Sequence, residues 1–156
     1  MKSSAKSARV EQQPPLRYGS VYQLAPQDRI QVIKRGIPAG YIDALSARMD
    51  IPKENLILFL GFSSATINRK VREHRTLSSH ESERVLGIEY LIGQVDQMVR
   101  ESGNPEQFDA ARWVSNWLSS PLPALGGETP ASYMDTVEGQ KLVSNLLAQA
   151  QSGAYA

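Results

Sequence analysis

The sequence of 156 residues contains no cysteine and only two histidines, His74 and His80. The lack of cysteine excludes disulfide bonds, a thiol nucleophile and a thiolate-bound metal ion. The two histidines have no further metal-binding side chains at the spacings that zinc sites use, so we expect no metal site. Both are interpreted as surface or helix-capping residues.

The sequence also has no uninterrupted apolar run of membrane-spanning length, and its charged N-terminus has no apolar segment of a signal peptide. No Ser/His/Asp set, Cys/His pair or paired carboxylates stand out, and no glycine-rich phosphate loop follows a strand. We therefore expect a soluble cytoplasmic protein that is not an enzyme, needs no cofactor and does not bind a membrane.

Charge is unevenly distributed along the chain, although the formal net charge is only +1. Residues 1–102 contain 15 Lys or Arg and 11 Asp or Glu, a balance of +4, whereas residues 103–156 contain 2 and 5, a balance of −3. A basic half joined to an acidic half indicates two different partners, and nucleic acid is the obvious candidate for the first.

The chain is predicted to begin with a flexible arm that precedes three short helices. Residues 1–25 are rich in Ser, Lys, Gln and Pro without hydrophobic periodicity, so we expect an unstructured leader; a basic arm that contacts phosphates is the alternative. Helices are predicted over residues 26–35, 39–49 and 53–60. In the first, Ile30 and Ile33 are expected to face inward, and in the second Ile42, Leu45 and Met49.

Residues 62–75 follow a turn at Gly61 and are predicted to form a helix with Ser63 as its N-cap. Ile67 and Val71 should pack on the preceding helix, while polar and basic residues point outward. A short helix, a glycine turn and a second helix of this kind indicate a helix-turn-helix motif, whose second helix would lie in a DNA major groove. This interpretation assigns DNA contact to Ser63, Ser64, Asn68, Arg69, Lys70, Arg72 and Arg75.

The residue types suggest how these contacts divide between bases and backbone. Arginine binds guanine and asparagine binds adenine through two hydrogen bonds each, so Asn68 and Arg69 are expected to reach base edges. Lys70, Arg72 and Arg75 are expected to contact phosphates. The alternative is an ordinary solvated helix face, and the basic balance of this half favours DNA.

Residues 78–101 are predicted to form a long helix, because Ser78 and Glu81 have the spacing of a capping box. Its apolar stripe consists of Val85, Ile88, Leu91, Ile92, Val95, Met98 and Val99. The stripe is either the core of the bundle or, in part, the seam of a homodimer of the kind that paired DNA half-sites favour, and both stay open. Residues 102–105 are expected to separate a domain of residues 26–102 from one of residues 103–156.

The stretch from Arg112 to Thr136 combines aromatic residues with prolines and glycines. Trp113 and Trp117 share one face of a predicted helix that ends before residue 121. Residues 122–125 are expected to be extended, residues 126–127 to form a sharp turn, and Thr129 and Pro130 to begin a short helix that carries Tyr133. The stretch is either a corner between core helices or, as its aromatic content favours, a partly exposed binding surface.

A last helix is expected from Thr136 to Ala150, with Asp135 and Glu138 as a capping-box-like start. Its inward residues should be Val143, Leu146, Leu147 and Ala150, and Gly139 should allow a close helix contact. Gly153 is the expected terminator, which leaves a small tail with one aromatic ring.

The series Trp-x-x-x-Trp-Leu-x-x-Pro at residues 113–121, then Leu-Gly-Gly-x-Thr-Pro at residues 125–130 and a helix with Gly139, closely resembles the toxin-binding domain of Xre/MbcA/ParS-type antitoxins. Residues 62–75 also resemble Xre-type repressor helices. The resemblance covers about residues 26–156. It implies an all-α protein with an N-terminal Xre-like helix-turn-helix bundle followed by a small helical toxin-binding domain.

Such antitoxins occlude the active site of RES-domain toxins, ADP-ribosyltransferase-like enzymes that consume NAD⁺. The resemblance implies the same partner here, together with operator DNA from the protein's own operon, which the protein would repress. An alternative is a stand-alone helix-turn-helix regulator whose C-terminal half dimerises or senses a ligand. The residues that the resemblance assigns to the toxin-binding domain are Trp113, Trp117, Leu122, Pro123, Leu125, Gly126, Gly127 and Tyr133, with Tyr155 and Ala156 as a masking tail.

Overall fold

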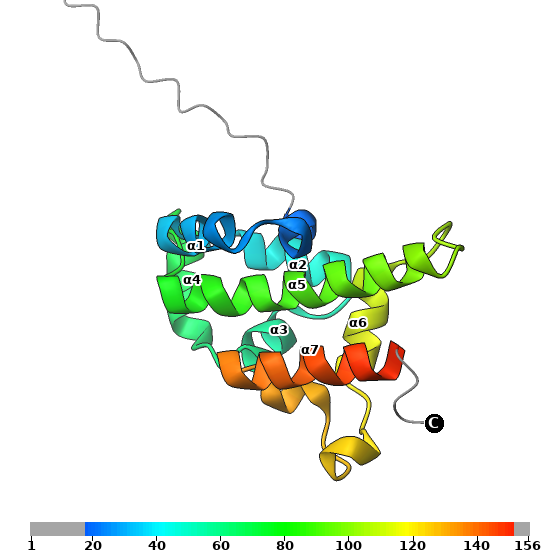
Figure 1. The fold of residues 1–156 in the computed structure, drawn as a ribbon. Coiled ribbons are helices and arrows are strands. Elements are labelled where there is room, and N and C mark those ends of the chain that lie inside the picture. Colours follow the sequence, from blue (N-terminus) through cyan, green and yellow to red (C-terminus); the bar gives the residue numbers. More distant parts are fainter. Residues whose placement is uncertain (1–17, 152–156) are drawn as a thin grey trace, which may run out of the picture.

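The structure, a computed structural model, describes residues 18–151 as a bundle of helices (Figure 1). Within this range it contains no β-strand, only an isolated bridge between Pro38 and Thr76. None of these helices has the length and apolar character that crossing a lipid bilayer requires. The all-α prediction is confirmed. The elements in chain order are η1 Tyr18–Gln23, α1 Pro26–Arg35, α2 Tyr41–Met49, α3 Lys53–Phe59, α4 Ser64–Arg72, α5 Ser79–Glu101, α6 Ala110–Leu118, η2 Pro123–Leu125, η3 Pro130–Tyr133 and α7 Val137–Gln151.

Helix α5 runs through the middle of the bundle, and η1, α1, α6 and α7 all pack against it (Figure 1). Its predicted capping box is present: the Ser78 hydroxyl accepts from the Glu81 amide at 3.1 Å, and the Glu81 carboxylate accepts from the Ser78 amide at 2.8 Å. Most of the predicted stripe is buried within the chain itself, so these residues form the core of the bundle, the first of the two alternatives, and are not available as a dimer seam. They are Val85, Ile88, Leu91, Ile92 and Val95.

Of the two isoleucines of α1 that were expected to face inward, only Ile33 packs against the core. Val32 is buried whereas Ile30 is 47% exposed, so the expectation for Ile30 is wrong. The inward face is the one that begins at Arg29, whose guanidinium lies 5.4 Å from the ring centre of Tyr90 on α5. Val32 and Ile33 follow Arg29 by three and four residues and therefore lie on the same face.

Helix α2 buries Ile42, Leu45 and Met49 as predicted, but it begins at Tyr41 rather than at Ala39. The amide of Ala39 donates to the carbonyl of Arg75 at 2.9 Å, beside the bridge between Pro38 and Thr76. This hydrogen bond joins the segment before α2 to the residues that follow α4.

The last part of the predicted flexible arm is structured, and the prediction is wrong there. Residues 18–23 form η1, Val21 is 1% exposed, and the rings of Tyr22 and Tyr90 meet edge to face at 4.9 Å. Val21 and Leu24, three residues apart, both pack against the core, but an element of six residues is too short to show a periodic apolar pattern. Residues 1–17 lie outside the described part of the chain.

Helix α7 buries Val143 and Leu147 against the bundle as predicted, and Leu146 is half-buried. Ala150 is exposed, contrary to expectation, because the whole last turn of α7, residues 148–151, extends beyond the core. The N-cap is Thr136 instead of the predicted Asp135. Its hydroxyl accepts from the amide of residue 139 at 2.9 Å, which satisfies a donor in the first turn.

Candidate functional site

Helix α6 presents the two tryptophans of the predicted binding surface. Asp109 caps the helix, and Val114 and Leu118 anchor it in the core. The rings of Trp113 and Trp117 stack with their centres 6.0 Å apart and their planes inclined by 15°. Trp113 is 38% exposed and Trp117 is half-buried, so the indoles are not sealed inside the bundle.

The segment after α6 forms a closed turn that projects from the helices in Figure 1. The Gly127 amide donates to the Leu122 carbonyl, and the Leu122 amide donates to the Glu128 carbonyl, both at 3.0 Å. Gly126 and Gly127 have φ angles of 65° and 90°, and no atom lies within 4 Å of where their Cβ atoms would be. The glycines therefore serve the backbone conformation rather than close packing, and the predicted sharp turn is confirmed.

The expected extended conformation of residues 122–125 is wrong beyond Leu122. Leu122 is extended, with φ −116° and ψ 131°, but Pro123–Leu125 form the 3-10 helix η2. The fixed φ of proline suits the first position of a helical turn, where its missing amide donor costs nothing. Pro123 and both glycines are exposed, whereas Leu122 and Leu125 are half-buried.

Tyr133 ends η3, and its backbone lies directly under the start of α7. A Cβ atom at Gly139 would stand 1.9 Å from the Tyr133 carbonyl oxygen, so only glycine allows this approach. The close contact expected of Gly139 is present, although its partner is the η3 backbone and not another helix. The Tyr133 side chain is half-buried and packs against the core.

Helices α3 and α4 form the predicted helix-turn-helix. Residues 60–63 make the turn, with Gly61 at a φ of 70°, and the Ser63 hydroxyl accepts from the Thr66 amide at 3.3 Å. Ile67 is buried and Val71 half-buried, as their spacing predicts. The predicted DNA-contact residues that are exposed are Ser63, Ser64, Arg69, Arg72 and Arg75, while Asn68 and Lys70 are half-buried.

Lys70 is engaged within the protein. Its ammonium lies 2.5 Å from the Glu81 carboxylate, and the Lys70 side chain is only 17% exposed. Burial by itself would raise the pKa of Glu81, but hydrogen bonds from Lys70 and Ser78 outweigh it and hold the pKa below its usual value. The pair connects α4 to the first turn of α5.

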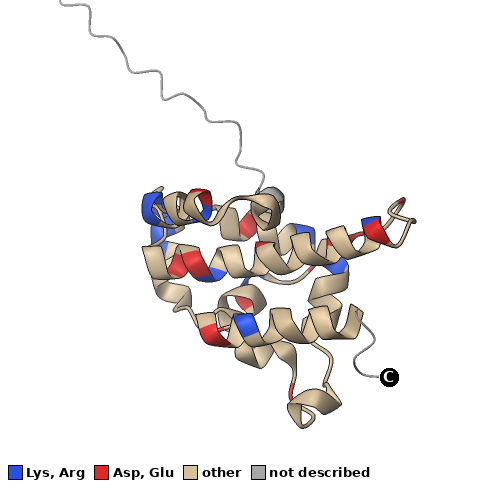
Figure 2. Ribbon diagram, viewed as in Figure 1, with Lys and Arg blue, Asp and Glu red and all other residues tan. Residues whose placement is uncertain are grey.

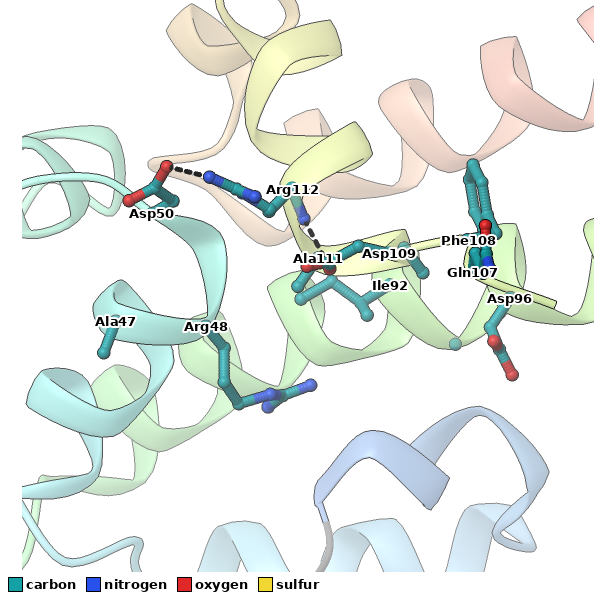
Figure 3. Close-up of a pocket in the computed structure, with 12 residues that line it drawn as sticks. Ala47, Arg48, Asp50, Ile92, Asp96, Gln107, Phe108, Asp109, Ala111 and Arg112 are labelled. Atoms are coloured by element: carbon teal, nitrogen blue, oxygen red, sulfur yellow. Dashed lines mark hydrogen bonds and ion pairs between the residues drawn. The ribbon is translucent and has the colours of Figure 1, made fainter. Parts of the chain in front are cut away.

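An open cavity of about 810 Å³ lies between α2, α5 and α6 (Figure 3), and none of the predicted contact residues lines it. Both of its arginines are in ion pairs: Arg112 lies 2.6 Å from Asp50, and Arg48 lies 2.5 Å from the buried Glu89. These pairs hold α2 to α6 and to α5. No group of three or more His, Asp or Glu side chains within residues 18–151 is placed to hold a metal ion.

Comparison with known proteins assigns a family to the N-terminal half and to the C-terminal half of the chain. Residues 28–89 match the antitoxin Xre-like helix-turn-helix domain, and residues 106–153 match the antitoxin Xre/MbcA/ParS C-terminal toxin-binding domain. The chain is also 43% identical to a Prs ADP-ribosylating antitoxin from Sphingobium sp. (strain YBL2) over 156 residues, which are 100% of this chain and 98% of the relative. The chain belongs to the Xre/MbcA/ParS antitoxin family. It is the antitoxin of a toxin–antitoxin system.

A second relative of this antitoxin is an antitoxin Xre from Yersinia enterocolitica serotype O:8 / biotype 1B (strain NCTC 13174 / 8081). It is 24% identical over 127 residues, which are 81% of this chain and 80% of the relative. The family resemblance inferred from the tryptophan and glycine motifs is therefore confirmed. The toxin-binding match includes α6, the turn of residues 122–128 and α7.

One residue that joins the two matched regions of the antitoxin is not evident from its sequence. The Arg84 guanidinium donates to the carbonyls of Leu60 at 2.7 Å and Asp135 at 3.3 Å, and it lies 4.9 Å from the ring centre of Phe62. The two carbonyls are 24 and 51 residues away in sequence, so neither periodicity nor capping rules indicate these contacts. The predicted tail residues Tyr155 and Ala156 lie outside the described residues.

Proposed function

We propose that this antitoxin binds a RES-domain toxin that consumes NAD⁺ and occludes its active site. The observations that support this proposal are the exposure of Trp113, whose ring stacks on that of Trp117, and the projecting turn of residues 122–128, which follows the same helix in the chain. Aromatic side chains in such a patch dominate the energy of many protein interfaces. Pro123, Gly126 and Gly127 are exposed in that turn, where a partner can approach the backbone closely.

The chemistry of the proposed toxin is supported by the name of the Sphingobium relative, which links that protein to ADP-ribosylation. ADP-ribosylation transfers ADP-ribose from NAD⁺ to an acceptor and therefore consumes NAD⁺. An inhibitor that covers an active site needs no catalytic group of its own. We accordingly propose a non-enzymatic role without a cofactor.

The proposed masking tail is tested by deleting residues 153–156 and co-expressing the antitoxin with the toxin encoded beside it. We expect the shortened antitoxin to bind the toxin but to leave it active, so that cellular NAD⁺ falls and growth stops. Trp113→Ala should instead weaken the complex itself, as measured by calorimetry. If the deletion changes neither growth nor affinity, Tyr155 and Ala156 do not mask the active site.

We also propose that α4 binds operator DNA in the major groove and that the antitoxin thereby represses its own operon in the cytoplasm. Exposed Ser63 and Ser64 lie at the N-terminus of α4, where hydroxyls and free amides suit phosphate, and Arg69 lies on its outer face. In the proposal Asn68 and Arg69 reach bases, while Lys70, Arg72 and Arg75 contact phosphates. Arg69→Ala should weaken binding by about 1–3 kcal/mol at one base position of the operator.

The antitoxin is proposed to occupy paired half-sites as a homodimer, which sedimentation of the protein with duplexes of one and two half-sites would test. Two chains per full operator are expected. The buried residues of the α5 stripe pack within one chain. The contact between the two subunits of the proposed homodimer must therefore involve other residues. Operator binding without any affinity for the neighbouring gene product would favour the stand-alone regulator instead.

A further inference from the structure

The end of α1 is fixed beside the end of α4, although the two are far apart in sequence. The Ala39 amide donates to the Arg75 carbonyl at 2.9 Å, and the Leu77 amide donates to the Ile37 carbonyl at 2.7 Å. Gly36 lies so close that a Cβ atom there would stand 2.9 Å from the Leu77 carbonyl oxygen. The last turn of α1 therefore keeps a fixed position next to the residues that follow α4.

This arrangement gathers positive charge at one end of the bundle. Residues 32–39 and 69–77 contain six Lys or Arg but one acidic residue, Glu73, which forms only an exposed pair with Arg75 at 3.4 Å. Figure 2 shows the blue ribbon segments meeting at the end of α1. Four of these cations are exposed. Two belong to the last turn of α1 and two lie at or just after the end of α4: Lys34, Arg35, Arg72 and Arg75.

The pairing of Lys70 changes how the charge near α4 is distributed. Lys70 neutralises the Glu81 carboxylate at 2.5 Å, and that carboxylate also accepts from the Ser78 amide in the cap of α5. A phosphate would therefore compete with the Glu81 carboxylate for the Lys70 ammonium. Lys34 is exposed and lies in the last turn of α1, outside the helix-turn-helix itself.

We propose that Lys34 and Arg35 form a second phosphate-binding site, which contacts the DNA backbone bordering the groove that α4 occupies. The inference rests on the proposed operator binding. It adds an element outside the recognition helix and assigns Lys70 a smaller part in neutralising phosphates. The competing explanation is that both cations serve only to stabilise the C-terminus of α1, where the helix dipole favours positive charge.

Salt dependence distinguishes the two explanations, because each protein cation that neutralises a phosphate steepens the fall of log K with log salt by about 0.9. Binding is measured by fluorescence anisotropy at several salt concentrations. The probes are the duplex immediately upstream of the antitoxin gene and a scrambled duplex of the same composition. The Lys34→Gln/Arg35→Gln protein should lose about 1.8 from the slope on both duplexes and keep its preference for the first.

Matched variants distinguish an effect of charge on DNA binding from an effect on the stability of α1 and from base recognition by α4. Lys34→Arg/Arg35→Lys should keep the full slope, and Lys70→Gln should change it by less than the Lys34 and Arg35 variant. Lys141→Gln/Arg100→Gln, the same charge change on α7 and at the far end of α5, should leave it unaltered. Arg69→Ala should remove the preference between the duplexes and thereby report on α4 alone.

Two results would overturn the inference in different ways. The Lys34→Gln/Arg35→Gln protein could show an unchanged slope and a lower melting temperature while the Arg69→Ala effect is intact. Both cations would then serve only to stabilise the C-terminus of α1. Operator binding by α4 would survive that result. If the unmodified antitoxin binds neither duplex, the proposed operator binding fails, and the second phosphate site fails with it.

Discussion

Gln140 on α7 lies against Gly87 on α5 so closely that a Cβ atom at residue 87 would stand 1.8 Å from Oε1 of Gln140. The Gln140 amide also donates to the carbonyls of Arg84 and Met134, each at 3.0 Å. A buried side chain thus connects α5, the end of η3 and α7 at one point. This contact fixes the start of α7 against α5.

Gly87→Ala should therefore lower the free energy of unfolding, since the added methyl group displaces Gln140 and breaks its hydrogen bonds. Overpacking of this kind costs about 1–3 kcal/mol, and the better helix propensity of alanine returns about 1 kcal/mol. Urea denaturation measures the difference. Gly40→Ala is the control, because Gly40 has a φ of −63° and no atom within 4 Å of its Cβ position. It should be neutral or stabilising by up to about 1 kcal/mol. Equal stability of the two variants would contradict the assigned role of Gly87.

The ion pair of Arg48 and Glu89 should contribute far more to stability than that of Arg112 and Asp50. Glu89 is fully buried, accepts from the Tyr41 hydroxyl and lies 2.5 Å from Arg48. Burial by itself would lower the pKa of Arg48, but the Glu89 carboxylate outweighs it and raises the pKa. Removing the guanidinium would leave a buried carboxylate without its counter-ion.

Arg48→Ala should accordingly cost about 3 kcal/mol in the free energy of unfolding. Arg112→Ala should cost less than about 1 kcal/mol, because the side chains of Arg112 and Asp50 are 59% and 67% exposed. Chemical denaturation of both variants makes the comparison, and Arg48→Ala/Glu89→Gln should recover part of the loss. A loss in Arg48→Ala no greater than in Arg112→Ala would contradict the role of the buried charge.

Glu81 should make stability depend on pH in the acidic range. Its folded pKa is lowered, so its contribution is present above the unfolded pKa of about 4.3 and is lost as the pH falls through the folded pKa. The difference in free energy of unfolding between the unmodified protein and Glu81→Gln should therefore be constant from pH 7 to about 5 and shrink below that. Urea titrations between pH 7 and 3 measure it, and a difference that grows on acidification would exclude this role.

The helices and the local geometry of the two proposed contact surfaces could be predicted because their signals are local. The capping box of Ser78 and Glu81, the four-residue spacing of the tryptophans and the glycine pair each depend on neighbouring residues only. The inward face of α1 could not be predicted in the same way. Ile30 and Ile33 had the right spacing, but the contact of Arg29 with Tyr90, which identifies the inward face, involves a residue on another helix.

The contacts that connect the surfaces could not be predicted for the same physical reason. Nothing near Arg84 in sequence indicates that its guanidinium donates to Asp135, and nothing near Lys70 indicates Glu81 as its partner. Glu89 lies within an apolar stretch of α5, yet its burial becomes intelligible only with Arg48 and Tyr41 in place. Such pairings arise from tertiary packing, which sequence periodicity does not contain.

The two tryptophans should respond differently to substitution, because the rings stack but only Trp113 is exposed beyond a third of its surface. Trp113→Ala should change the free energy of unfolding by less than about 1 kcal/mol and weaken toxin binding by at least about 2 kcal/mol. Trp117→Ala should lower both, since the Trp117 ring also packs against the core. Calorimetry with the toxin and urea denaturation give the two quantities.

The control for this comparison is Ile30→Ala, which removes an apolar side chain of similar exposure, 47%, from α1. In Figure 1, α5 lies between α1 on one side and α7 with the projecting turn on the other. The loss of apolar surface from α1 in Ile30→Ala should therefore leave the affinity for the toxin unchanged. If Trp113→Ala binds toxin as tightly as Ile30→Ala does, the stacked indoles serve the bundle alone. In that case the partner must recognise a different part of the antitoxin, and the projecting turn of residues 122–128 would be the next surface to vary.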